Sequence, residues 1–137
     1  MRLVVNTNRI VAALIKNSFS RKIITSRKFE LITASLAKIE IKKHKAEIIK
    51  KSHLPEAEFE RLLSVIFKKV YVVNDSIIRS KEVPARKIMD SIDPDDSPFI
   101  ALALSVKNDG IWSDDEHFTK QDRIKIWKTK DLSRYVT

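Results

Sequence analysis

The sequence contains no cysteine, which excludes disulfide scaffolds, thiolate metal sites and cysteine nucleophiles. No apolar run approaches the roughly 18 residues that a membrane-spanning helix needs. Met1 and Arg2 lead directly into an apolar run, without the charged lead, apolar stretch and cleavage site of a secretory signal. No repeat, low-complexity segment or linker is evident in the 137 residues. We therefore expect one domain over residues 1–137, located in the cytoplasm and not associated with a membrane.

Positive charge is unevenly distributed along the chain, whose formal net charge is +9. Residues 1–51 contain 13 Lys and Arg against 3 Glu, whereas residues 52–137 contain 14 Lys and Arg against 15 Asp and Glu. A basic half attracts polyanions, RNA and DNA first among them. A solvated lysine-rich surface is the simpler interpretation of such a charge run. That interpretation does not explain why the carboxylates collect in the other half of the chain.

Short apolar runs alternate with helical patterns from one end of the chain to the other. Asn8, Ser35 and Asp96 are expected to cap helices, and Pro84 is expected to bend or interrupt one. This alternation favours a three-layer α/β/α sandwich around a central, mainly parallel sheet of four or five strands. The predicted strands are 3–5, 29–34, 70–73, 110–113 and about 124–127, and the predicted helices include a short one from Ser18 or Ser20, 35–51, 55–69, 76–89, 97–106 and one from Thr129.

Polar side chains collect where the predicted strands end. In parallel sheets, sites form at the carboxyl ends of the strands. Glu40, in addition, borders the apolar face of a predicted helix, which is an unfavourable place for a carboxylate without a partner. The residues at the strand ends and in the nearby turns are Asn6, Asn8, Asp93, Asp95, Asp96, Asp114, Asp115 and Glu116.

Each of these residues also has an ordinary structural interpretation. Asp96, Asp114 and Asp115 could cap helices, and Asp93 and Asp95 are common turn residues beside Pro94. Carboxylates that converge on one edge repel one another, however, and a hard divalent cation relieves that repulsion. Such a cation can activate water and stabilise charge on a phosphate. An acidic metal pocket beside a basic surface is the layout expected of a metal-dependent nuclease.

Four segments resemble those of the PIN-domain nucleases, in order and over nearly the whole chain. LVVNTNRIVAAL is similar to the opening of the family, where the first strand ends in Asp-Thr-Asn. IEIKKHK, 39–45, resembles the segment that supplies the family's Glu from a helix. DGIWSDDEHF, 109–118, resembles the late strand and loop that supply the family's last carboxylate. The strongest match is DPDDSPFIALAL, 93–104, an acidic residue at a helix start followed by a Phe-Ile-Ala-Leu-Ala run.

The resemblance implies an α/β/α fold and a Mg²⁺- or Mn²⁺-dependent phosphodiesterase that acts on RNA. It also implies a toxin of a toxin–antitoxin pair, with an antitoxin or other protein partner, and a homodimer. By position, Glu40, Asp96 and either Asp114 or Asp115 would hold the metal, with Asn6 as a further ligand, and Thr7 and Asn8 would support the site. The implied reaction is hydrolysis by metal-activated water that leaves a 3′-hydroxyl. The basic residues expected to hold the RNA backbone are Arg21, Lys22, Arg27, Lys28, Lys42, Lys43 and Lys45.

Position 6 departs from the family pattern, because Asn6 stands where the family has Asp. An amide oxygen can still ligate a hard cation, but it lacks the negative charge. At ~4 Å and an effective dielectric constant of ~20, one unit charge attracts another by about 4 kcal/mol, and desolvation reduces this benefit. We therefore expect weakened metal binding and turnover, either in a natural member of reduced activity or in a deliberately disabled variant.

Two other classes of function use a similar arrangement of residues. The first is a catalytically inactive PIN-like module that binds RNA or a protein partner. The second is a phospho-acceptor receiver domain, which requires an acidic pair after the first strand that NTN does not supply. His44 is expected to be a surface residue. Trp112, Trp127, Phe99 and Phe118 are expected to pack in the core rather than stack on bases.

Overall fold

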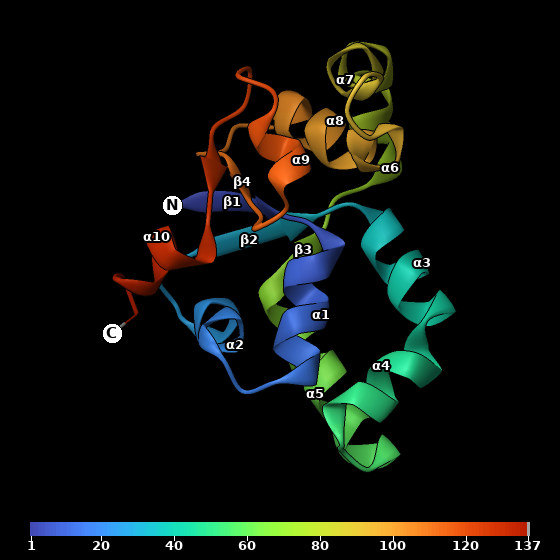
Figure 1. The fold of residues 1–137 in the computed structure, drawn as a ribbon, viewed down its shortest axis with the longest axis vertical. Helices are drawn as coiled ribbons and strands as arrows, with labels where there is room; N and C mark the ends of the chain where they lie inside the picture. The colour runs from blue at the N-terminus through green and yellow to red at the C-terminus, as the bar shows by residue number, and fades with distance from the viewer. Residues whose placement is uncertain (137) are drawn as a thin grey trace.

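The computed structural model describes residues 1–136, and within that range five parallel strands form one sheet in the order β3-β2-β1-β4-β5. Figure 1 shows the sheet at the centre of the molecule with helices on both sides. The α/β/α fold predicted from the alternation of apolar runs is confirmed. The elements in chain order are β1 (Arg2–Val5), α1 (Thr7–Ile15), α2 (Phe19–Thr25), β2 (Glu30–Thr33), α3 (Ser35–Lys43), α4 (Lys45–Ser52), α5 (Glu56–Lys69), β3 (Val70–Val72), α6 (Asp75–Arg79), α7 (Glu82–Met89), η1 (Pro94–Asp96), α8 (Ser97–Ser105), β4 (Ile111–Trp112), α9 (Glu116–Thr119), β5 (Ile126–Trp127) and α10 (Thr129–Ser133).

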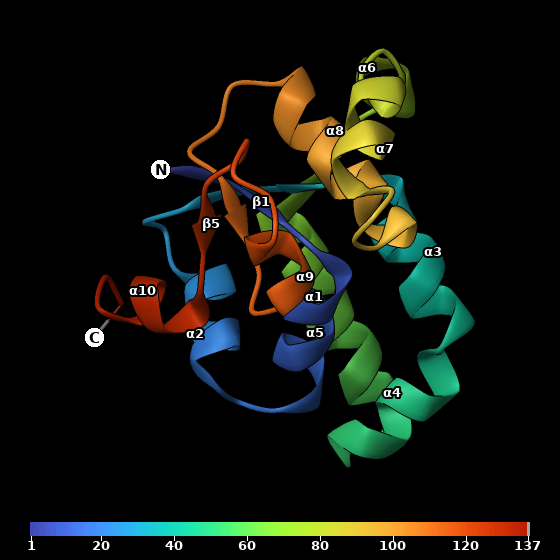
Figure 2. The same ribbon diagram turned by 45° about the horizontal axis from the view of Figure 1, so that its top comes forward.

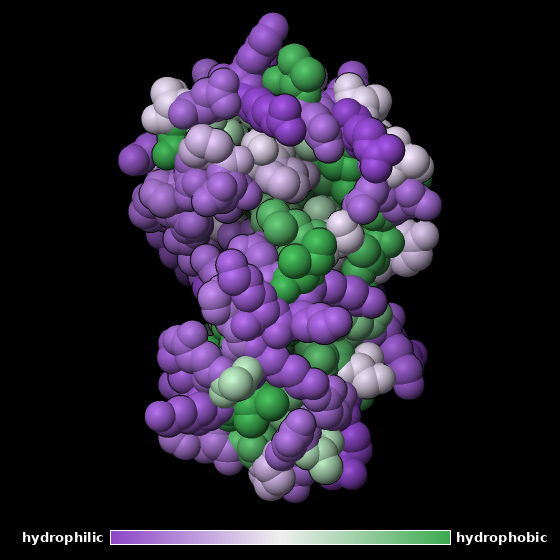
Figure 3. Space-filling model, turned by 90° about the vertical axis from the view of Figure 1, so that its right-hand side faces the viewer, coloured by the Kyte–Doolittle hydropathy of each residue, from purple (hydrophilic) through white to green (hydrophobic). Residues whose placement is uncertain are grey.

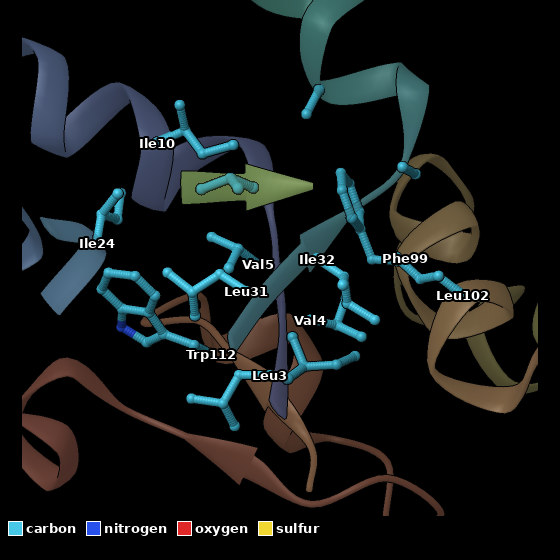
Figure 4. Close-up of a cluster of buried hydrophobic side chains, with 14 of the residues drawn as sticks. Leu3, Val4, Val5, Ile10, Ile24, Leu31, Ile32, Phe99, Leu102 and Trp112 are labelled. Atoms are coloured by element: carbon cyan, nitrogen blue, oxygen red, sulfur yellow. The ribbon is translucent and has the colours of Figure 1, made fainter. Parts of the chain in front are cut away.

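The core lies on both faces of the sheet because side chains alternate along each strand. Val4 of β1 faces α8, where Phe99 is buried, whereas its neighbour Val5 faces α1 and α2 (Figure 4). Trp112 of β4 is fully buried on the same side as Val5. Phe118 is also fully buried, so the expectation of core packing is confirmed for Trp112, Phe99 and Phe118.

Trp127 differs from the other large aromatic side chains because it is only partly buried. Its indole nitrogen donates to the carbonyl oxygen of Asp109 at 2.8 Å, and Lys125 Nζ lies 3.9 Å from the ring centre.

At the carboxyl end of the chain, α10 packs against α2 (Figure 2).

Several helix boundaries differ from the predicted ones. The segment 35–51 is two helices that meet at His44, and both of them contact α1. The segment 76–89 is also two helices, and the interruption falls at Ser80 and Lys81. Pro84 lies in the first turn of the second helix, where the missing N–H has no intrahelical acceptor to lose.

Two predicted caps are wrong. Asn6 and not Asn8 caps α1, because β1 ends at Val5 and the helix begins one residue after Asn6. Ala34 occupies the N-cap of α3 in place of Ser35, whose hydroxyl donates to Asp75 Oδ1 at 2.6 Å instead. Asp96 does stand at the N-cap of α8, but its side chain makes no capping hydrogen bond.

One face of the molecule, formed by α3, α6 and α7, exposes apolar side chains. Ile39 is 60% exposed and Val83 is 61% exposed. Figure 3 shows hydrophobic side chains on this side of the molecule gathered in patches between hydrophilic ones. Within residues 1–136, no helix has the length and apolar composition that crossing a membrane requires.

Candidate metal centre

The candidate site lies where the strand order changes direction. The chain adds β2 and β3 on one side of β1, then crosses over and adds β4 and β5 on the other. Loops leave β1 and β4 in opposite directions at such a switch point and open a crevice at the carboxyl ends of the strands. Asn6 directly follows β1 and Ser113 directly follows β4. Both residues are therefore at the centre of this crevice.

Asn6 is 3% exposed, and both the nitrogen and the oxygen of its amide make hydrogen bonds. Its Oδ1 accepts from the backbone N–H of Arg9 at 3.4 Å, which caps α1. Its Nδ2 donates to Ser113 Oγ at 2.9 Å. The same hydroxyl oxygen accepts from the backbone N–H of Asp115 at 3.0 Å. Position 6 thus joins the end of β1 to the loop that holds Asp115.

Thr7 holds Glu40 beside the end of β1. Thr7 Oγ1 donates to Glu40 Oε1 at 2.6 Å, so the carboxylate that borders the apolar face of α3 has a hydroxyl partner. Glu40 also borders a groove of about 250 Å³ between α1 and α4. Asn8 and His44 are exposed and line the same groove.

The turn before α8 directs two of its three aspartates inward. Asp93 caps η1, its Oδ1 accepting from the N–H of Asp95 at 3.1 Å. Asp95 is exposed. Asp96 is different, because its side chain is 19% exposed and its Oδ2 has no hydrogen-bond partner among residues 1–136. A buried carboxylate oxygen without a donor is unfavourable and calls for a cation or a proton.

The pKa of Asp96 reflects these surroundings. Burial first, and then the nearby negative charges of Asp93, Asp115 and Glu40, raise the pKa of Asp96 to about 7 against the opposing effect of His117. Asp93 lies in the same turn as Asp96, whereas Glu40 and Asp115 come from two other segments, and all three are close enough to Asp96 to raise its pKa. Glu40, Asp93, Asp96 and Asp115 therefore form one acidic cluster.

The adjacent residues Asp114 and Asp115 have different surroundings. Asp114 Oδ2 lies 2.7 Å from Arg9 Nη1 and accepts from Thr129 Oγ1 at 2.6 Å, while its Oδ1 accepts from Thr129 N–H at 2.8 Å. Both oxygens of Asp114 thus connect β4 to α1 and α10. Asp115 is the residue whose carboxylate approaches Asp96. Glu116 points elsewhere and pairs with Lys128 Nζ at 2.9 Å.

His117 was not predicted as a site residue, and Asp93 was predicted among the carboxylates near the strand ends but not among the metal ligands. His117 Nδ1 lies 3.3 Å from Asp93 Oδ2, 3.3 Å from Asp115 Oδ1 and 3.9 Å from Asp96 Oδ2. The signal in the sequence is a histidine directly after three acidic residues, in the loop already chosen as a ligand source. Its position against Asp93 depends on a contact between segments 24 residues apart and could not be read from that loop alone.

The seven basic residues expected to bind RNA fall into two groups. The first is on α2 and in the connection from α2 to β2, and the second is on α3 and α4. Lys45 pairs with Glu60, which raises the pKa of Lys45, and Arg21 Nε donates to the Ala13 carbonyl. The first group is Arg21, Lys22, Arg27 and Lys28, and the second is Lys42, Lys43 and Lys45.

The acidic cluster has the donor chemistry of a divalent metal site. One ligand atom from each of Asp93, Asp96 and His117 lies within 4.8 Å of the other two. Carboxylate oxygens are the ligands that Mg²⁺ and Mn²⁺ accept, and an ion placed among them would satisfy the free Asp96 oxygen. The residues present therefore fit a divalent cation.

The sequence model of the PIN-domain family matches residues 4–137. The chain therefore belongs to the PIN-domain family, whose members are generally metal-dependent nucleases. No match was found among curated proteins. The family assignment agrees with the α/β/α fold and with the carboxylates gathered at the carboxyl ends of β1 and β4.

Proposed function

We propose that this chain is a metal-dependent endoribonuclease of PIN type whose activity is lowered by Asn6. The observation behind the proposal is the acidic cluster around the unpartnered oxygen of Asp96. Carboxylates from η1, α3 and the loop after β4 meet there, although no two of these elements are neighbours in sequence. Carboxylates this close repel one another. Such repulsion is typical of functional sites, and a bound cation relieves it.

The residues have distinct roles in this proposal. Asp96 and Asp115 would hold the divalent ion together with Glu40, whose orientation Thr7 fixes. Asn6 would offer at most a neutral oxygen, and that oxygen already accepts from Arg9 N–H. A bound divalent ion supplies an activated water and stabilises negative charge on the phosphate. Asp114 has no place among the ligands, because Arg9 and Thr129 use both of its oxygens.

RNA is the proposed substrate, and the basic residues of the first half of the chain would contact its backbone. Lys42 and Lys43 are exposed on the same helix as Glu40, which makes them the best placed of the seven. Contacts of lysine with phosphate give affinity without base specificity. A toxin role, an antitoxin partner and a homodimer stay predictions from the family, and Ile39 and Val83 on α3 and α7 offer a surface for a protein partner.

The alternative is a catalytically inactive PIN domain that binds RNA or protein. Asn6 is the observation that favours it, because its amide completes a hydrogen-bond network that would not by itself need a metal. The two functions make different predictions for the Asn6→Asp variant. Restored cleavage supports an enzyme, and RNA binding without cleavage by either protein supports the inactive module.

The test is cleavage of a labelled single-stranded RNA with Mn²⁺, Mg²⁺ or EDTA. The unmodified chain should cleave slowly, Asn6→Asp faster, and the double variant Asn6→Asp/Asp96→Asn not at all. Asp95→Asn in the Asn6→Asp background is the matched control, because Asp95 lies one residue away but is exposed. Activity that survives Asp96→Asn, or that is lost equally with Asp95→Asn, would contradict the site.

A further inference from the structure

We propose that His117 is a nitrogen ligand of the divalent ion at this cluster, and that the site consequently prefers a transition ion such as Mn²⁺ or Co²⁺ to Mg²⁺. The inference rests on the metal site of the proposed function and refines it by naming a ligand and a class of ion. It concerns a side chain that the acidic residues alone do not predict.

The position of the imidazole is the first argument. His117 Nδ1 lies 3.3 Å from one oxygen of Asp93 and 3.3 Å from one oxygen of Asp115. Two ligand atoms at ~2.1 Å from one ion are separated by about 3.0 Å at adjacent octahedral corners. The observed separations are close to that value. Asp96 Oδ2, at 3.9 Å from Nδ1, is within reach of the same ion after a small movement.

The second argument is that two buried atoms of the cluster make no hydrogen bond within residues 1–136. His117 Nδ1 and Asp96 Oδ2 are both shielded from solvent, and neither makes a hydrogen bond within residues 1–136. The His117 side chain as a whole is 44% exposed, so the ring turns its buried nitrogen toward the carboxylates and its other edge outward. A cation between the two atoms would satisfy a nitrogen lone pair and a carboxylate oxygen at once.

The backbone holds the ring in this place. Asp115 caps α9 by accepting from the N–H of His117 at 2.9 Å, which fixes residue 117 relative to the Asp115 carboxylate. Phe118, the next residue, is fully buried and anchors the short helix to the core. The imidazole is therefore presented to the cluster by a fixed turn and not by a free surface loop.

The donor set determines the preferred ion. Imidazole nitrogen binds transition ions well, whereas Mg²⁺ selects oxygen ligands and gives up its waters reluctantly. A nitrogen ligand should therefore contribute much to the binding of Co²⁺, less to that of Mn²⁺ and least to that of Mg²⁺. The competing interpretation is that His117 is a protonated counter-ion for Asp93 and Asp115. In that case the imidazolium would compete with the metal, and its removal would tighten metal binding.

Calorimetric titration of the full chain with Co²⁺, Mn²⁺ and Mg²⁺ separates these interpretations. His117→Ala should weaken Co²⁺ binding by about tenfold or more, Mn²⁺ binding in the same direction, and Mg²⁺ binding by a clearly smaller factor. His44→Ala is the matched control, because His44 lines the groove beside Glu40 and has no carboxylate of the cluster within ion-pair distance in residues 1–136. Each titration is repeated in the Asn6→Asp background, where binding is expected to be tighter.

A second measurement needs no substitution at His117. Proton NMR of the Co²⁺-loaded chain should show a hyperfine-shifted, exchangeable imidazole N–H. The same signal should remain in the His44→Ala control, because His44 is not the proposed ligand. Bound Co²⁺ without this signal, or unchanged or tighter Co²⁺ binding by His117→Ala, would overturn the inference and leave the proposed nuclease intact. Absence of any divalent-ion binding, even in Asn6→Asp, would overturn both.

Discussion

Asn6 Nδ2 donates to Ser113 Oγ at 2.9 Å and joins residues 107 positions apart across the centre of the sheet. The direction of this bond is determined by the rest of the network. Asn6 Oδ1 must accept from Arg9 N–H, and Ser113 Oγ already accepts from Asp115 N–H. The amide at position 6 therefore organises the loop that contains Asp115 without adding charge to it.

Asn6→Asp should increase Mn²⁺ affinity by at least about tenfold, because a full negative charge replaces a neutral amide beside the cation. The hydroxyl of Ser113 can turn to donate to the new carboxylate, and a carboxylate remains a good cap for α1. Isothermal titration calorimetry measures the change. Asn8→Asp adds the same charge at an exposed position two residues along. If Asn8→Asp increased Mn²⁺ affinity as much as Asn6→Asp, the increase would come from the added negative charge alone and not from its position at residue 6.

The free energy of unfolding should fall as pH rises through the pKa of Asp96. The folded protein retains the Asp96 proton up to a pKa of about 7, whereas the unfolded chain loses it near its ordinary value of about 3.9. The folded state thus binds more protons between these values, so stability is greatest below pH 4 for this group and is lost toward pH 7.

Urea denaturation in EDTA from pH 5 to 8 measures this dependence. Asp96→Asn should remove part of the downward slope, since an amide does not titrate, whereas the exposed control Asp95→Asn should retain it. Metal binding should release a proton at pH 6 and less at pH 8, because the metal requires the ionised carboxylate. Identical slopes for the unmodified protein and Asp96→Asn would argue against the raised pKa.

Local patterns were sufficient to predict the sheet and much of the acidic cluster. The apolar runs of β1 and β2 were recognisable because these strands are mostly buried and bounded by polar residues, and that of β3 because it stands between polar residues although Tyr71 is exposed. Glu40 stood out as a carboxylate next to apolar helix positions, and Asp96 as an acidic residue before an apolar helix. These features depend on neighbours in sequence, which is why they could be found.

The remaining features depend on contacts between distant segments. Neither proline nor glycine marks the break at His44, which instead allows α3 and α4 both to contact α1. The different surroundings of Asp114 and Asp115 are determined by Arg9, about a hundred residues earlier, and by Thr129. The contact of His117 with Asp93 likewise joins α9 to the turn before α8. No local pattern specifies these pairings.

Gly110→Ala should destabilise the protein by about 1–3 kcal/mol, because Gly110 is at φ 132°, a conformation that side chains other than glycine rarely adopt. A methyl group there would lie 2.4 Å from the carbonyl oxygen of Lys125, which accepts from Ile111 N–H and pairs β4 with β5. Thermal melting should show a clear decrease in Tm. The exposed control Lys107→Ala should change stability by less than about 0.5 kcal/mol.

Asp114→Asn and Asp115→Asn should affect different properties, although the two residues are adjacent. Asp114→Asn removes the ion pair with Arg9 and weakens the bonds to Thr129, leaving Arg9 partly buried without its counter-charge. We expect this substitution to lower the free energy of unfolding by about 1–3 kcal/mol while Mn²⁺ affinity per folded molecule stays nearly unchanged.

Asp115→Asn removes a charge that faces Asp96 and His117, which should weaken Mn²⁺ binding and cleavage in the Asn6→Asp background. It should leave the stability of the metal-free protein unchanged or slightly higher, because repulsion within the cluster decreases. Urea denaturation and calorimetric metal titration of both variants measure the two properties separately. If Asp114→Asn weakened Mn²⁺ binding more than Asp115→Asn did, the last carboxylate of the site would be Asp114.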